Sequence, residues 1–202
     1  MGTRNRRIGL VGLAAVLVWL GGCLGGNSAS PTFYTLTPVE VSAPAPAPAQ
    51  AGLALGVGPV TLPAYLDRPQ LVTRTGQDAL NLAEFDRWAE PLKAGVPRVL
   101  GDNLSALLGT SRVSLFPWGK PQAVRYQVAV DVTRFEGVAG GTVVLGARWR
   151  VLGSDGAELL VKQTTITEAT GAAGSDALVA AMNRALGALS RDLAAALREL
   201  PR

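Results

Sequence analysis

Apolar and polar residues alternate in the stretch Tyr126-Gln-Val-Ala-Val-Asp-Val132, and they alternate again in Val143-Val-Leu-Gly-Ala-Arg-Trp-Arg-Val151. Successive side chains of a β-strand point to opposite faces of its sheet. Each stretch therefore gathers its large apolar residues on one face, and Gln127 and Asp131 lie on the other. This period of two predicts antiparallel strands with one buried face. Leu159–Thr167 continues the sheet after a tight turn signal, Ser154-Asp155-Gly156.

The first predicted helix runs from Trp88 to Leu108 and keeps its apolar residues near one face. Pro91 suits the first turn of a helix, because the N–H that proline lacks has no partner there. Pro97 is expected to kink or restart the helix, because it removes an internal hydrogen bond.

The second predicted helix begins at Ser175, which is expected to cap it, and ends at Leu200. Its large apolar residues recur at spacings of four and three and form a single stripe. Such a stripe favours packing on the chain's own sheet. A coiled-coil seam between subunits is the alternative interpretation.

These patterns predict an α+β fold, a mostly antiparallel sheet with two main helices packed on one face. Further strands are expected at Phe33–Leu36, Leu53–Val60, Gln70–Arg74, Ala79–Ala83 and Arg112–Phe116. A single domain is predicted to span residues 33–202. The Pro/Ala-rich tract at 38–52 is expected to be a surface loop within it, because it favours extended polyproline conformations and cannot pack a core.

The first 22 residues have the pattern of a signal peptide. Arg4, Arg6 and Arg7 form a basic start, and Ile8–Leu20 is wholly apolar or glycine. That run is about 13 residues, within the ~7–15 of a signal-peptide core and short of the ~20 that span a bilayer. A retained helical anchor is the alternative, but a helix is weakened by the glycines that follow, Gly21, Gly22, Gly25 and Gly26.

Cys23 is the single cysteine of the chain, and the small residues directly before it, with Leu20 three positions upstream, are typical of a bacterial lipobox. Signal peptidase II is then expected to cut before Cys23. The sulfur becomes a thioether to a diacylglycerol with acyl chains such as palmitate, an effectively permanent anchor. Residues 23–32 are expected to form a lipidated tether that reaches at most ~30 Å. No other cofactor is predicted.

The composition disfavours an enzyme. The chain has no histidine, which excludes a Ser-His-Asp triad and a histidine metal site. The acidic cluster Glu84–Glu90 is interpreted as the start of a helix, where carboxylates favour the positive end of the dipole. The chain has 19 Lys+Arg and 15 Asp+Glu. Three of the basic residues precede Cys23, so the mature chain is nearly neutral. We therefore predict a binding or scaffolding protein, with no nucleic acid as partner.

Two prolines bracket residues 63–69, here called the Pro-bracketed segment, and they stiffen it by fixing φ and restricting their predecessors. Tyr65 and Leu66 are expected to form an apolar knuckle beside the charges of Asp67 and Arg68. A preshaped surface of this kind loses little entropy on association, which favours docking. A strand crossover whose arginine is satisfied internally is the alternative. The candidate partner-binding residues are Tyr65, Leu66, Asp67, Arg68, Arg74 and Trp88.

Short motifs follow one another along the mature chain: Phe33-Tyr34-Thr35-Leu36, Val57-Gly58-Pro59-Val60, Leu62-Pro63-x-Tyr65-Leu66-Asp67-Arg68-Pro69-Gln70 and Trp88-Ala89-Glu90-Pro91-Leu92. Val99-Leu100, Asn103-Leu104, Phe135 and Trp149 come after them. In this order they resemble the PqiC/YmbA-type lipoproteins, the auxiliary components of ABC-type intermembrane transport systems. Asp67-Arg68-Pro69 is the most specific part of the resemblance, and the insertion at 38–52 and Pro97 depart from the family's pattern.

The resemblance implies an outer-membrane lipoprotein that faces the periplasm of a Gram-negative bacterium. It implies docking of a periplasmic MCE-domain protein, in a system similar to those that move lipids between membranes and maintain envelope integrity. A homo-oligomer such as a ring is expected, with the Pro-bracketed segment and the last helix as contact surfaces. Two alternatives stay open: an envelope lipoprotein that binds peptidoglycan or cell-wall synthesis machinery, and a lipid carrier with its own acyl-binding cavity.

Overall fold

The computed structural model describes residues 30–38, 52–118, 124–138 and 140–201. The predicted signal peptide at 1–22, Cys23, most of the tether and almost all of the Pro/Ala-rich loop lie outside the described residues. These assignments, and the domain boundaries that depend on them, remain predictions. The described elements all belong to one compact unit, Pro31–Arg202.

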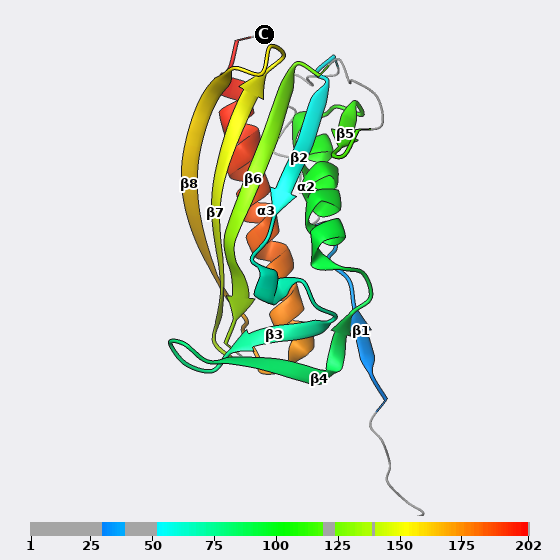
Figure 1. The fold of residues 1–202 in the computed structure, drawn as a ribbon, viewed down its shortest axis with the longest axis vertical. Helices are drawn as coiled ribbons and strands as arrows, with labels where there is room; N and C mark the ends of the chain where they lie inside the picture. Colours follow the sequence, from blue (N-terminus) through cyan, green and yellow to red (C-terminus); the bar gives the residue numbers. More distant parts are fainter. Residues whose placement is uncertain (1–29, 39–51, 119–123, 139, 202) are drawn as a thin grey trace, which may run out of the picture. The chain divides into compact units, whose positions relative to one another are not determined.

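Eight strands of the described chain form one mixed sheet (Figure 1). The three long strands are β6 (Tyr126–Gly137), β7 (Thr142–Gly153) and β8 (Glu158–Ala169), which pair antiparallel in chain order. The shorter ones are β1 (Thr32–Tyr34), β2 (Leu55–Thr61), β3 (Gln70–Arg74), β4 (Leu80–Trp88) and β5 (Val113–Leu115). The antiparallel strands predicted from the alternating stretches are confirmed.

The edge of β6 that faces away from β7 is shared by two shorter strands. β2 runs parallel to the first half of β6, and β3 pairs in parallel with its last residue, Gly137, through Thr73. β5 extends the sheet beyond β2, whereas β4 and β1 extend it beyond β3. The sheet therefore forks along β6, and the Pro-bracketed segment lies in the part of the chain that spans the fork.

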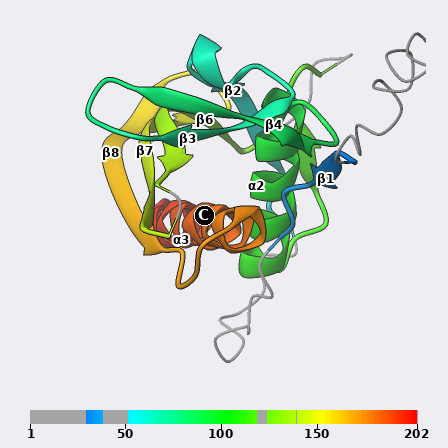
Figure 2. The same cartoon turned by 90° about the horizontal axis from the view of Figure 1, so that it is seen from below.

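Two helices pack on one face of the sheet, so the predicted α+β class is confirmed (Figure 2). α2 (Leu92–Leu108) contacts β2 and β5, while α3 (Ser175–Glu199) contacts β6, β7 and β8. The apolar stripe of α3 is buried in the chain's own core, which favours internal packing over a coiled-coil seam. Its buried members are Leu178, Met182, Leu186, Leu189, Leu193 and Leu197.

The first helix begins later than predicted, because β4 continues through Trp88 and α2 starts only at Leu92. The predicted strand Ala79–Ala83 is the beginning of this longer strand. The acidic cluster Glu84–Glu90 lies mostly in β4, so its interpretation as a helix start is wrong. Hydrogen bonds across the β3–β4 pair and the β1–β4 pair stabilise the strand there.

The helices differ from the predictions at two points. α2 continues through Pro97, so it does not restart there, and Pro97 forgoes only the N–H that would reach the carbonyl of Lys93. Ser175 is the first residue of α3 rather than its cap, and Gly174 holds the N-cap position without a side-chain hydrogen bond. The hydroxyl of Ser175 donates instead to Asp86 Oδ2 at 2.7 Å, which joins α3 to β4.

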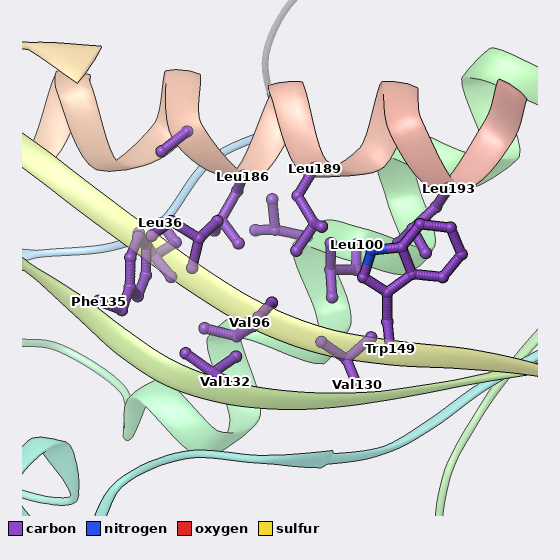
Figure 3. Packing of buried hydrophobic residues seen from close by; sticks show 14 of the residues in the cluster. Leu36, Val96, Leu100, Val130, Val132, Phe135, Trp149, Leu186, Leu189 and Leu193 are labelled. Atoms are coloured by element: carbon purple, nitrogen blue, oxygen red, sulfur yellow. The ribbon is translucent and has the colours of Figure 1, made fainter. Parts of the chain in front are cut away.

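The hydrophobic core lies between the sheet and the helices. Figure 3 shows Leu186, Leu189 and Leu193 on the face of α3 that points toward the sheet, where Phe135 and Trp149 lie. Phe135 and Trp149 are 0% and 1% exposed. Trp149 Nε1 donates to the hydroxyl of Thr164 at 3.0 Å, so its polar atom is satisfied within the packed core.

Candidate docking site

The Pro-bracketed segment connects β2, which ends at Thr61, to β3, which begins at Gln70. Within it, Ala64–Leu66 forms a single 3₁₀ turn, η1, which follows the extended backbone of Pro63. A hydrogen bond of 2.9 Å from Leu66 N to Pro63 O closes the turn. At the other end, the carbonyl of Pro69 accepts a hydrogen bond from Trp88 N at 2.6 Å, which joins the segment to β4.

Glu136 of β6 contacts the Pro-bracketed segment, and its side chain is fully buried. Its Oε2 accepts hydrogen bonds from the Tyr65 hydroxyl at 2.8 Å and from Phe135 N at 3.1 Å. Its Oε1 accepts from Arg74 Nε and Arg134 Nε, each at 2.9 Å. Four donors satisfy a carboxylate that water does not reach, as a buried charge requires. Glu136 thereby joins the segment, β3 and β6.

Tyr65 is held in its protonated form by this cluster. Burial is the largest cause, the hydrogen bond to Glu136 and the nearby negative charge add to it, and together they raise the pKa of Tyr65 to about 12. The hydrogen bond to Glu136 also raises the pKa of Arg74. With two guanidinium groups around one carboxylate, the cluster carries net positive charge.

Tyr65→Phe is expected to reduce the decline in the free energy of unfolding between pH 10 and about 12. The folded-state pKa of Tyr65 lies above the usual value near 10, so its contribution is fully present below pH ~10 and is lost as the pH rises toward about 12. The variant should lose about 1–2 kcal/mol near neutral pH, because Glu136 forfeits one hydrogen bond. Denaturant unfolding between pH 8 and pH 11.5 measures both effects. Parallel declines of both proteins above pH 10 would contradict this role of Tyr65.

The six candidate partner-binding residues fall into different environments. Tyr65 and Arg74 take part in the Glu136 cluster, while Leu66 and Trp88 belong to the core at 1% and 5% exposure. The expectation that Leu66 forms part of an exposed apolar knuckle is therefore wrong, because the 3₁₀ turn buries its side chain. Asp67 is exposed and Arg68 is half-buried.

Asp67 and Arg68 line a small pocket of about 190 Å³, whose other walls are Pro69, Trp88, Ala89, Glu90 and Pro91. Asp67 forms an exposed ion pair with Lys93 at 3.2 Å. Glu90 is engaged by Arg98 of α2. Among the described residues, Arg68 Nε has no hydrogen-bond partner although the atom is buried. A buried N–H without an acceptor is uncommon in native proteins, so a residue that lines this pocket carries an unused donor.

Glu136 and Arg134 were not among the site residues predicted from the sequence. The available signal was a carboxylate directly after Phe135 in a long apolar strand. Alternation places such a residue on the face opposite the core, where a charged side chain is normally solvated. The sequence pattern does not reveal that the Pro-bracketed segment covers this part of β6, and so the burial of Glu136 could not be inferred.

A second hollow, of about 370 Å³, lies away from the candidate residues, on the face of the long strands that carries Asp131, Arg148 and Arg150. Its walls include charged side chains of both signs. Within the described ranges, no three His, Cys, Asp or Glu side chains gather where they could hold a metal ion. None of the described helices is long and apolar enough to cross a membrane.

Two solved structures share this fold. An uncharacterised protein matches with a TM-score of 0.69 at 21% identity, over 84% of this chain and 99% of the other. A protein from Xanthomonas campestris matches with a TM-score of 0.67 at 20% identity, over 81% and 92% of the two chains. At these identities the likeness shows the fold alone.

Sequence comparison defines the family. The intermembrane transport lipoprotein PqiC of Escherichia coli K12 is 32% identical over 140 residues, which cover 69% of this chain and 71% of the relative. The same protein of Shigella flexneri matches equally. The family model of the ABC-type transport auxiliary lipoprotein component matches residues 34–194, which include every described strand and helix except part of β1 and the end of α3. The resemblance noted from the motifs is thereby confirmed, and the chain belongs to the family of ABC-type transport auxiliary lipoproteins.

Proposed function

We propose that this lipoprotein docks a periplasmic MCE-domain protein of an ABC-type transport system to the outer membrane and so supports envelope integrity. The pocket of Asp67 and Arg68 is the contact site, and the role is not catalytic. The observation that carries the proposal is Arg68, whose side chain lines a pocket open to the surface and whose buried Nε has no acceptor among the described residues. A carboxylate or carbonyl oxygen of a partner that enters the pocket would pair with the guanidinium group of Arg68.

The rigidity around Arg68 supports docking. The prolines on its segment restrict the backbone, and Tyr65 and Leu66 are held by Glu136 and by the core. A surface that is already ordered loses little conformational entropy when a partner binds. The Arg68 pocket therefore has the preorganisation that an efficient contact needs.

The lipid anchor in this proposal is Cys23, and its tether gives the domain a reach of at most ~30 Å from the membrane. Leu24 follows Cys23 in place of the Asp that favours inner-membrane retention in enteric bacteria, which supports the outer membrane. We also propose a homo-oligomer such as a ring. The outer edges of β5 and β8 have no partner strand in the described chain, and free strand edges are available for pairing between subunits.

The two alternative functions have less support. A lipid carrier needs an apolar enclosure for acyl chains, whereas both hollows described above are lined in part by charged side chains. No feature of the described residues favours a role with peptidoglycan or cell-wall enzymes. Both remain as outcomes of the experiment.

Crosslinking and pull-down of the membrane-anchored protein is expected to recover an MCE-domain protein. Arg68→Glu and Arg68→Met should each reduce recovery at least about tenfold, because loss of a hydrogen-bonded charge at an interface costs ~2–5 kcal/mol. Arg148→Glu, an exposed substitution on β7, is the matched control and should leave recovery unchanged. Thermal unfolding confirms that each variant is folded.

Two results would overturn the proposal. Full recovery of the partner by folded Arg68 variants would exclude the Arg68 pocket as the contact site. Recovery of cell-wall enzymes alone by the wild-type protein would assign the protein to the wall-synthesis alternative. Phospholipid retained in stoichiometric amount by the purified protein, without any protein partner, would assign it to lipid carriage.

A further inference from the structure

Large apolar side chains are exposed together at one end of the fold. Phe33 of β1 is 59% exposed, Leu82 and Phe85 of β4 are 41% and 42% exposed, and Leu80 and Val138 are also exposed. Water-exposed apolar side chains are common singly, whereas a contiguous apolar patch marks a surface that contacts something apolar.

Strand pairing brings these residues to the same end. β1 runs parallel to β4 with Phe33 opposite Arg87, so Phe33 shares a face of the pair with Phe85, two positions from Arg87. The pairing of Thr73 with Gly137 brings the end of β6, and therefore Val138, beside the β3–β4 pair. Figures 1 and 2 show β1, β3 and β4 together at this end of the fold.

The chain enters the fold at this same end. β1 is the first described element, and its first residue, Thr32, is nine positions after Cys23. At ~3.3–3.6 Å per residue these positions span at most ~30 Å. The carbonyl of Pro201 is bound by Arg125 and Tyr126 at the start of β6, so the C-terminal end lies one β6 length away, roughly 36 Å at ~3.3 Å per residue. The exposed apolar group is thus at the end nearest the proposed anchor.

The charges at this end do not form a basic patch. Arg87 Nε donates to the Glu84 carbonyl, Arg74 and Arg134 are both engaged by Glu136, and Asp86 accepts from Ser175. Asp78 and Glu84 add negative charge. A contact here therefore depends on apolar side chains rather than on attraction to anionic lipid.

We propose that this end of the fold, carrying Phe33, Leu80, Leu82, Phe85 and Val138, is a membrane-contact surface that rests in the headgroup region of the bilayer. The proposal rests on the lipid anchor at Cys23 in the proposed function, because a short tether keeps this end close to the membrane. The contact fixes the orientation of the domain on the bilayer, with its C-terminal end turned toward the periplasm.

Site-specific fluorophores test the proposal. Cys23 is the only cysteine, and a thioether there cannot react, so an engineered cysteine is labelled selectively. Leu82→Cys and Phe85→Cys, each carrying an environment-sensitive dye, are examined in the lipidated full-length protein on vesicles of phosphatidylethanolamine and phosphatidylglycerol with a nitroxide-labelled lipid. Leu159→Cys is the matched control, because it is equally exposed and lies in β8 near the opposite end of the long strands.

The dyes at residues 82 and 85 are expected to emit at shorter wavelength and to be quenched by the nitroxide lipid, whereas the dye at 159 is not. High salt should leave the quenching unchanged. Equal, weak quenching at all three sites would overturn the proposal. A blue shift that follows protein concentration and ignores the nitroxide would also overturn it, in favour of contact with a second copy of the chain.

Mass spectrometry of the intact protein separates this proposal from the anchor itself. Absence of acyl groups on Cys23 would refute the proposed anchor. Quenching at residues 82 and 85 of that same chain, mixed with the vesicles, would still show that this end contacts lipid. Acylation without quenching would refute the contact surface and leave the anchor intact.

Discussion

Glu136→Ala is expected to lower the free energy of unfolding by about 3–5 kcal/mol, the usual cost of removing one partner from a buried ion pair. Three side-chain donors and one backbone N–H converge on this carboxylate. Its removal leaves Tyr65 and Phe135 N without an acceptor and sets two arginines against each other. Native domains are stable by only ~5–15 kcal/mol, so the loss is a large share of the total.

Denaturant unfolding measures the effect of Glu136→Ala, and the melting temperature should fall by on the order of 10 °C. The matched control is Glu168→Ala, which breaks a more exposed ion pair with Arg184 at 3.3 Å and should cost less than about 1 kcal/mol. If both substitutions cost the same small amount, Glu136 does not hold the Pro-bracketed segment on the sheet.

Leu66→Asp is expected to leave the protein unfolded or insoluble. Leu66 is 1% exposed and belongs to the main core cluster. The substitution removes apolar packing worth about 2–5 kcal/mol and adds the cost of burying a carboxyl group without a partner. The two costs together reach the whole stability of a typical domain.

Far-ultraviolet circular dichroism and yield of soluble protein report the result for Leu66→Asp. Leu66→Met conserves volume and should cost less than about 1.5 kcal/mol, so it is the matched control. A soluble, cooperatively folding Leu66→Asp protein would show that η1 is not part of the core. If the expectation holds, loss of partner binding in this variant says nothing about docking, and Arg68 is the residue at which docking is to be tested.

The alternating strands and the α3 stripe were predictable because each pattern is local. The period of two in Tyr126–Val132 and Val143–Val151 follows directly from which side chains of each strand are buried. The spacing of four and three among the leucines of α3 likewise follows from the buried face of the helix. The parallel pairing of β2 and β3 with β6 was not predictable in this way. Alternation reports the buried face of a strand and carries no information about its neighbour or its direction.

The candidate site was predictable only in part. The two prolines indicated a stiff segment, and the segment is held by Glu136 through Tyr65 and by Trp88 N through the carbonyl of Pro69. Leu66 was misplaced because a single 3₁₀ turn rotates consecutive side chains to different sides, and no short pattern distinguishes that turn from an extended strand. The role of Glu136 depends on a contact between β6 and a segment about 70 positions earlier in the chain, which no local pattern contains.

β1 also has a mechanical consequence, because any tension on the chain ahead of Ser30 is transmitted to the fold through it. β1 is joined to β4 by parallel pairing, the carbonyl of Leu36 is held by Arg98 of α2, and Thr37 exchanges hydrogen bonds with Asn183 of α3. A pull along a paired strand loads its hydrogen bonds in shear, so they resist together rather than opening one by one. Three elements thus share the load, so a domain held by its first strand would keep its core closed under tension.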